Sequence, residues 1–218
     1  MTQPVTHAPA DSLPAPAPAS VPTSAPAAAV SDRALPVRDR ILNAATALFY
    51  AEGIRAVSAD KIIQAAGITK VTFYRYFPSK DDLVVAYLEN RAAWERAGIS
   101  HVLARAENHP SIALGLVARA LGDEACVPGF RGCAFLNAGA EYPDPEHPVR
   151  VVIDEHRRWG IRTAREALEK IGVPDAESVA EELMMLRDGA MISGYVSDPS
   201  TVGQNLFKAG RAVIQYRG

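Results

Sequence analysis

The 218-residue sequence has few of the residues that mark several common protein classes. Two cysteines are too few for a disulfide scaffold, and their C-x6-C spacing, without nearby His or Cys ligands, does not make a four-ligand zinc site. The sequence also lacks a nucleophile motif, a phosphate-binding loop and a metal-binding helix pair. We therefore expect neither an enzyme nor a metalloprotein, and no cofactor.

Long apolar runs are also missing, so no segment is expected to cross a bilayer. Residues 1–35 lack the basic start and apolar centre of a signal peptide, and a cytoplasmic location is expected. These residues are rich in Ala, Pro and Ser and contain no run of large apolar side chains, which predicts a disordered tail. The remaining chain is long enough to bury a substantial core.

The formal charge of −2 conceals an asymmetry along the chain. From Arg33 to Lys80 there are eight basic and three acidic side chains, whereas from Asp81 to Gly218 there are fifteen basic and twenty acidic ones. The first segment is therefore positive and the second negative. Most charge clusters are solvated surfaces, but a basic segment that also carries a DNA-binding motif is expected to bind phosphate.

The segment between Arg38 and Leu83 predicts three short helices. The first ends at Gly53, because glycine tolerates the left-handed geometry that ends helices. The second begins after Ser58, whose hydroxyl can cap it, and ends at Gly67. Apolar residues lie on one face of each helix: Ile41, Leu42, Ala45, Leu48 and Phe49 in the first, and Ile62, Ile63 and Ala66 in the second.

A third helix, Lys70 to Phe77, follows the glycine turn, and Thr69 can cap it. Phe73 and Phe77 stand four residues apart and are expected to face inward. The outward side chains are then Lys70, Thr72, Tyr74 and Tyr76. Two helices joined by a tight glycine turn predict a helix-turn-helix, whose second helix enters the major groove of DNA.

The tract TKVTFYRYFPSKDDL, from Thr69 onward, resembles the DNA-binding domain of the TetR family of one-component repressors. It combines a cap, an aromatic and basic recognition helix, a proline break and a second cap at Ser79. The family commonly has glycine at the position of Val71, and the β-branched residue bears on how closely this helix approaches the bases. The resemblance implies a helix-turn-helix domain over residues 36–82 and a helical ligand-binding and dimerisation domain over residues 83–218.

Seven residues are predicted to contact DNA: Ser58, Thr69, Lys70, Thr72, Tyr74, Tyr76 and Lys80. Thr69, Lys70 and Thr72 lie at the start of the recognition helix, where side chains point to base edges. Lys70 could equally bind a phosphate.

The resemblance implies phosphate contacts for Tyr74 and Tyr76, which could instead be half-buried packing residues. Lys80 lies at the next helix start, where its ammonium and the local N–H groups could bind one phosphate. Ser58 is either a phosphate ligand or only a cap. Before this unit, Arg33, Arg38 and Arg40 form either a phosphate-binding arm or a solvated linker.

Beyond Pro78 no alternating strand pattern appears, so we expect an all-α protein of about nine helices. Ser79 and Asp82 form a capping box that opens a long helix to about His101 or beyond. The other expected helices are Ser111 to about Ala125, Ala134 to Ala140, Val149 to Ile171, Asp175 to Val196 and Ser200 to Tyr216. The segment YPDPEHP, residues 142–148, predicts a loop because its three prolines oppose a helix interior.

The last two helices carry apolar residues at helical spacing: Val179, Leu183, Leu186 and Ala190, then Val202, Leu206, Ala209 and Val213. Periodicity alone does not separate intramolecular packing from an interface. The resemblance implies a homodimer through a four-helix bundle of these helices. Such a dimer would place two recognition helices about 34 to 36 Å apart and match a palindromic operator in double-stranded DNA.

The resemblance also implies a small-molecule effector, bound between helices of the larger domain. The candidate lining residues, chosen for size or polarity, are Trp94, His101, Phe135, Asn137, His156, Trp159, Met184 and Met185. Each could instead be a core residue, and His156 a hydrogen-bonded core histidine. The expected function is a repressor released from its operator by this effector, with activation left open.

Three alternatives remain. Cys126 and Cys133 could form a redox switch, or they are two unrelated reduced thiols that cap or pack neighbouring helices. An all-α enzyme would draw on Glu141, Asp144 and Glu146, but these acids lie in a proline-rich loop where solvation explains them. An architectural DNA-binding protein would have no ligand cavity.

Overall fold

The structure, a computed structural model, describes residues 35–106 and 109–217. These residues form nine α-helices and one 3-10 turn, without a strand, which confirms the predicted all-α class. The helices are α1 (Val37–Glu52), α2 (Ala59–Ala66), α3 (Lys70–Tyr76), α4 (Lys80–Arg105), α5 (Pro110–Ala125), α6 (Ala134–Glu141), α7 (Pro148–Glu169), α8 (Ala176–Val196) and α9 (Val202–Arg217). The predicted disordered tail, apart from Leu35, lies outside the described residues.

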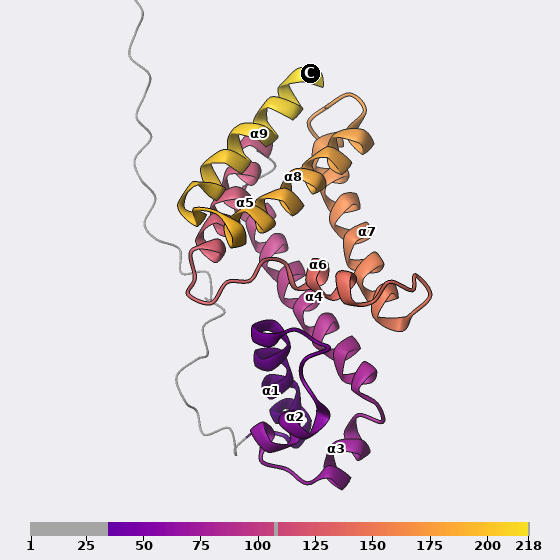
Figure 1. Cartoon of the computed structure of the whole chain (residues 1–218). Coiled ribbons are helices and arrows are strands. Elements are labelled where there is room, and N and C mark those ends of the chain that lie inside the picture. The colour runs from indigo at the N-terminus through magenta and orange to yellow at the C-terminus, as the bar shows by residue number, and fades with distance from the viewer. Residues whose placement is uncertain (1–34, 107–108, 218) are drawn as a thin grey trace, which may run out of the picture.

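The helices form a small unit of α1, α2 and α3 at one end and a larger group at the other, with α4 running between them (Figure 1). In the larger group, α5 packs against α9, and α8 packs against both α7 and α9. The short α6 lies beside α4 and α7. None of the described helices is long and apolar enough to span a membrane.

The small unit is a helix-turn-helix with the predicted caps. The Ser58 hydroxyl accepts a hydrogen bond from the Lys61 N–H at 3.2 Å, and the Thr69 hydroxyl accepts one from the Thr72 N–H, also at 3.2 Å. Gly67 has a φ of 60°, the left-handed conformation that glycine adopts without strain. Each cap therefore satisfies backbone groups that the helix end leaves free.

Helix α4 begins with the predicted capping box. Asp82 accepts from the Ser79 N–H at 2.9 Å, and the Ser79 hydroxyl accepts from the Asp82 N–H at 3.1 Å. The helix continues to Arg105, four residues past His101. Its first half buries Leu83, Val84, Ala86, Tyr87, Leu88 and Ala92.

Several helix ends differ from the sequence expectation by a few residues. Pro148 is the first residue of α7 and not the last of the loop, because a proline at this position loses no helical hydrogen bond. The last helix begins at Val202 and not at Ser200, since Pro199–Thr201 form a 3-10 turn before it. Helix α7 ends at Glu169, before Ile171, with Gly172 in the left-handed conformation.

One hydrophobic core connects the two ends of the molecule. It includes Ile41 and Phe49 from α1, Tyr87 from α4, Phe135 from α6 and Met191 from α8. A second cluster joins α7 and α8 through Leu168, Ala176, Val179 and Ala180. The small unit is therefore packed directly onto the larger group.

The apolar stripes expected on the last two helices pack at least partly within the chain. Val179, Val202 and Leu206 are buried. A different face of α8 is open, where Met185 and Val196 are each 67% exposed and Ile192 is 45% exposed.

Candidate functional site

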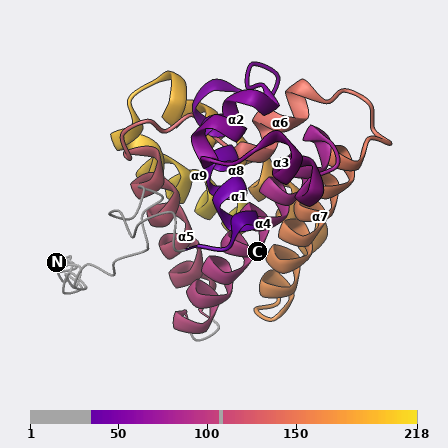
Figure 2. The ribbon, with the colours of Figure 1, turned by 90° about the horizontal axis from the view of Figure 1, so that it is seen from below.

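The outward face of α3 carries exposed apolar and aromatic side chains. Val71 is 81% exposed, and Tyr74 and Tyr76 are also exposed, whereas Phe73 and Phe77 are buried beneath them as predicted. Figure 2, which views the end of the molecule where α1, α2 and α3 lie, shows α2 and α3 near its surface. Both tyrosines of α3 are thus accessible to a partner.

The polar residues at the start of α3 contact one another and α2. The Lys70 ammonium lies 3.2 Å from a carboxylate oxygen of Asp60, and both side chains are largely exposed. The hydroxyls of Thr69 and Thr72 are 2.9 Å apart. Exposed pairs of this kind are worth at most about 1 kcal/mol, so Lys70 can exchange Asp60 for a DNA group.

Lys80 is less accessible than its position at a helix start suggested. Its ammonium lies 5.9 Å from the centre of the Phe49 ring. Burial lowers the pKa of Lys80, partly offset by the charges of Glu141 and Asp81. A phosphate contact would require the lysine side chain to swing away from α1.

The arginines of the expected N-terminal arm also pack on the helix-turn-helix. A guanidinium nitrogen of Arg40 donates to the carbonyl oxygens of Ala66 and Gly67, at 2.5 and 3.1 Å. The guanidinium of Arg38 lies 5.3 Å from the centre of the Phe77 ring. Arg40 therefore holds the turn between α2 and α3, a role that 26 residues of sequence separation concealed.

In the larger group, three of the predicted effector-binding residues form a stack. The Phe135 and His156 rings are 4.0 Å apart with planes at 14°, and the Trp159 ring is 5.5 Å from His156. A fourth, Met184, lies close to Gly160, since a Cβ there would be 2.6 Å from its methyl group. Among the described side chains, Trp94, His101, Asn137 and Met185 are exposed and do not join this stack.

Two hollows lie elsewhere in the larger group. One, of about 240 Å³, is lined by Gly115, Arg119, Gly122, Asp123, Cys126, Ser200, Gly203 and Gln204. The other, of about 80 Å³, is lined by Leu103, Ala106, His109, Ala113, Thr163, Glu166, Ala167 and Lys170. The predicted effector-binding residues line neither hollow within the described part of the chain.

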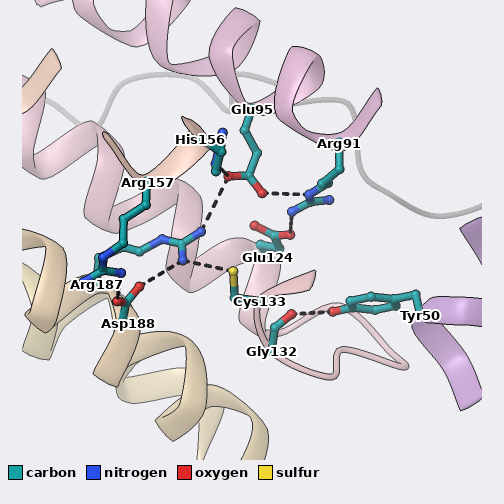
Figure 3. Close-up of polar contacts among 10 residues, drawn as sticks. All are labelled: Tyr50, Arg91, Glu95, Glu124, Gly132, Cys133, His156, Arg157, Arg187 and Asp188. Atoms are coloured by element: carbon teal, nitrogen blue, oxygen red, sulfur yellow. Dashed lines mark hydrogen bonds and ion pairs between the residues drawn. The ribbon is translucent and has the colours of Figure 1, made fainter. Parts of the chain in front are cut away.

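Beside the stack lies a set of charged and polar residues, hereafter the polar cluster (Figure 3). The sequence analysis had singled out only Cys133 and His156 among them, and for other roles. Its members are Arg91, Glu95, Glu124, Cys133, His156, Arg157, Arg187 and Asp188. They come from α4, α5, α7 and α8 and, for Cys133, from the residue before α6, so only the i,i+4 pair of Arg91 and Glu95 had a local signal in the sequence.

Glu95 is the centre of the polar cluster. Its carboxylate oxygens lie 2.8 Å from Arg91 Nε and 3.0 Å from His156 Nε2, and one of them lies 3.5 Å from an Arg187 nitrogen. Burial alone would raise the pKa of Glu95, but the hydrogen bond from His156 and the two arginines lower it to about 2. Glu95 is therefore a charged carboxylate in the core.

Further ion pairs extend the polar cluster on both sides. Arg91 also pairs with Glu124, and Asp188 pairs with both Arg157 and Arg187. Burial opposes the charge on Arg187, but Cys133, Glu95 and Asp188 raise its pKa. Removing one member would leave its buried partners uncompensated, which is more damaging than the pair is stabilising.

The two cysteines lie at opposite ends of the α5–α6 loop and are both free. Cys126 is exposed and follows the last residue of α5. Cys133 is buried immediately before α6, and its sulfur accepts a hydrogen bond from Arg187 at 3.0 Å. The sulfur atoms thus have different surroundings.

The α5–α6 loop and α6 also contact the helix-turn-helix unit. The Tyr50 hydroxyl donates to the Gly132 carbonyl at 3.0 Å and accepts from the Arg131 N–H at 2.9 Å. At the other end of α6, the Glu141 carboxylate accepts from the N–H groups of Ile54 and Arg55, at 2.9 and 2.6 Å. The sequence analysis had placed Glu141 only among solvated loop acids.

The start of α4 is held in a similar way. The Tyr142 hydroxyl donates to an Asp81 carboxylate oxygen at 2.9 Å, and His147 Nε2 lies 3.4 Å from the other oxygen. The first and last residues of the loop between α6 and α7 therefore bind the first turn of the connecting helix.

Comparison with known proteins agrees with this architecture. Residues 41–87 match the family described as "Bacterial regulatory proteins, tetR family". The crystal structure of SCO4454, a TetR-family transcriptional regulator from Streptomyces coelicolor, is 41% identical, with 83% of this chain and 95% of that chain covered and a TM-score of 0.79.

Two curated relatives from Escherichia coli K12 are also regulators. The HTH-type transcriptional regulator YjdC is 24% identical over 71% of this chain and 81% of its own length. The HTH-type transcriptional repressor NemR is 27% identical over 61% of this chain and 67% of its own. Both the DNA-binding segment and the whole helical arrangement match known regulators that are not enzymes, and this chain belongs to the TetR family of transcriptional regulators.

Proposed function

We propose that this protein is a homodimeric repressor that a small molecule releases from a palindromic operator. TetR regulators bind DNA and dimerise. The observation that carries the proposal is the exposed outer face of α3, where Tyr74 and Tyr76 stand over a buried Phe73. A helix that buries one face and exposes tyrosines on the other can enter a major groove and contact the phosphates along its sides.

On this surface, the residues fall into two groups. Thr69, Lys70 and Thr72, at the start of α3, face base edges. The phosphate contacts come from Tyr74, Tyr76 and the cap residue Ser58, and from Lys80 once its side chain leaves Phe49.

The second subunit binds the open face of α8. Met185, Ile192 and Val196 recur there at spacings of seven and four residues, so their exposed side chains form one apolar stripe. A second copy that covers this stripe, together with α9, removes the apolar surface from water and gives the dimer two recognition helices.

The effector binds at the stack of Phe135, His156 and Trp159. Support comes from Nδ1 of His156, which is buried and has no hydrogen-bond partner among the described residues. Buried polar atoms usually have a partner, and an effector could supply one. Met184, whose methyl group lies close to Gly160, is a further candidate contact beside this stack. Trp94, His101 and Asn137 are exposed and do not join it.

A redox response through Cys126 and Cys133 is the second candidate. The hydrogen bond from Arg187 to Cys133 favours it, because protein thiols react where cationic groups adjoin the sulfur. The related NemR from E. coli has been solved in a "reduced form". Burial of Cys133 opposes it by limiting access. Peroxide that weakens DNA binding of the native protein, but not of Cys133→Ser, would support this candidate.

The test of the main proposal is a mobility shift with DNA from the protein's own upstream region, at two salt concentrations. Tyr74→Phe removes one hydroxyl and Lys70→Ala removes one charge from α3. Each should weaken binding by roughly tenfold or more. Lys170→Ala removes the same charge from an exposed site on the larger group and should leave binding unchanged.

The salt dependence of binding shows whether Lys70 contacts a phosphate or a base. A positively charged side chain that binds a DNA phosphate contributes about one unit to the slope of log affinity against log salt concentration. If Lys70→Ala lowers affinity without changing this slope, Lys70 contacts a base. If the wild-type protein binds no duplex selectively, in this region or from a random pool, the repressor proposal fails.

A further inference from the structure

The end of α1 and the segment that follows it are held to the larger group by two separate sets of hydrogen bonds. Tyr50 binds the backbone of Arg131 and Gly132, before α6, and Glu141 at the end of α6 binds the N–H groups of Ile54 and Arg55. Arg131 also donates to the carbonyl of Ala51. We call these contacts the α6 clamp.

The α6 clamp satisfies backbone groups that neither α1 nor α2 pairs. Gly53 ends α1 with a φ of 93°, so the chain leaves the helix and the next two N–H groups point away from it. Ile54 is buried, and an unpaired N–H there would be unfavourable. A charged carboxylate that accepts two successive N–H groups is a strong acceptor, and it defines their direction.

Tyr50 fixes the other side of the segment. Burial raises the pKa of Tyr50, partly offset by the hydrogen bond from Arg131, so the hydroxyl stays protonated and donates to Gly132. It both donates and accepts within one loop turn, which restricts sliding of α1 along the loop. The α6 clamp thus contacts Tyr50 and Ala51 at the end of α1, and Ile54 and Arg55 after it.

The same loop ends in the polar cluster. Cys133, next to Gly132, accepts from Arg187, and Arg187 contacts Glu95 and Asp188 (Figure 3). Phe135, the second residue of α6, stacks on His156. Phe135, which would meet an effector, therefore belongs to the same short helix as Glu141, which holds the segment after α1.

We propose that Glu141 and Tyr50 are positioning residues for DNA binding. They fix the tilt of the helix-turn-helix unit on the larger group. This inference rests on the proposed function, since the tilt sets the separation of two recognition helices only in a dimer on DNA.

The first experiment needs no DNA. Amide hydrogen exchange is measured on the full-length protein, its Glu141→Gln variant and a Glu155→Gln control, which removes the same charge from an exposed position on α7. Glu141→Gln should speed exchange at Ile54 and Arg55 by roughly tenfold or more, while the control leaves it unchanged. Unchanged exchange in Glu141→Gln overturns the clamp.

The second experiment measures preference for half-site spacing. Operators selected from random duplexes by the wild-type protein are lengthened or shortened by one central base pair, and affinities are compared for wild type, Tyr50→Phe, Glu141→Gln and the control Tyr216→Phe. A variant with a loosened clamp should lose several-fold less affinity than the wild type when the half-site spacing is altered. A merely less stable protein would lose affinity for all spacings alike.

The two experiments separate the possible failures. If wild type selects no duplex, the proposed function fails, and the exchange result still tests the clamp. If wild type selects an operator but both variants keep its full spacing preference, the positioning role is wrong although the protein is a DNA-binding regulator.

Discussion

Glu95 shows how one side chain can carry much of the electrostatics of a helical core. It is held as an anion by His156, Arg91 and Arg187, and each of these partners comes from a different turn or helix. Glu95 keeps its negative charge because three donors surround the carboxylate. The same charge compensates the burial of the two arginines.

We predict that Glu95→Gln destabilises the protein at neutral pH and changes its acid response. The pKa of Glu95, about 2 in the fold, lies below the unfolded value of about 4.3, so its stabilisation is complete above pH 4.3 and is lost as pH falls towards 2. The shift corresponds to roughly 3 kcal/mol.

The measurement is the free energy of unfolding in urea at several pH values between 7 and 3. The difference between wild type and Glu95→Gln should shrink as pH falls, whereas the exposed-site variant Glu155→Gln should stay near wild type throughout. A constant difference across this range would show that Glu95 acts through shape and not through charge.

At the scale of elements, the crossing of α5 and α9 brings the backbones of two glycines together. A Cβ on Gly122 would lie 2.9 Å from both the Cα and the N of Gly203. The two backbones approach because neither glycine has a side chain, and α5 and α9 share extensive contact along their length.

We predict that Gly122→Ala lowers the free energy of unfolding by roughly 1–3 kcal/mol, because the helices must separate. Gly98→Ala, in α4, meets no atom within 4 Å and should raise stability by about 0.5–1 kcal/mol through its better helix propensity. Urea unfolding of both variants provides the comparison. If both variants change the free energy of unfolding by the same amount, α5 and α9 can separate at the crossing without loss of stability.

The helices and their caps were predictable from sequence because their signals are local. Ser58, Thr69 and the Ser79–Asp82 box each act within three residues. The α6 clamp was not predictable, since Glu141 meets Ile54 across 87 residues and the same acid suits a solvated loop. The polar cluster was hidden for the same reason, whereas the stack of Phe135, His156 and Trp159 was partly found from residue size.

At the scale of the whole molecule, the open stripe on α8 is the proposed dimer interface. The sequence pattern drew attention to Val179 and Leu206, which the fold buries within one chain. Met185, Ile192 and Val196 are exposed on a different face of α8. Helical spacing alone did not show which face is buried and which is exposed.

We predict that Ile192→Asp converts the dimer to a monomer, with at least about a hundredfold weaker association, because it places an unpaired charge in an apolar interface. Ile112→Asp changes an isoleucine of similar exposure, 49% against 45%, on α5 and should leave the dimer intact. Analytical ultracentrifugation distinguishes the outcomes. A dimeric Ile192→Asp would place the interface elsewhere.

The hydrophobic core that runs from Ile41 through Tyr87 to Met191 has a consequence for modular exchange. A chimaera that grafts residues 36–82 onto another sensor would cut through this core, and it would also discard the acceptors for Ile54 and Arg55. New operator specificity is therefore better engineered by exchanging surface residues of α3 alone than by transplanting the whole DNA-binding unit.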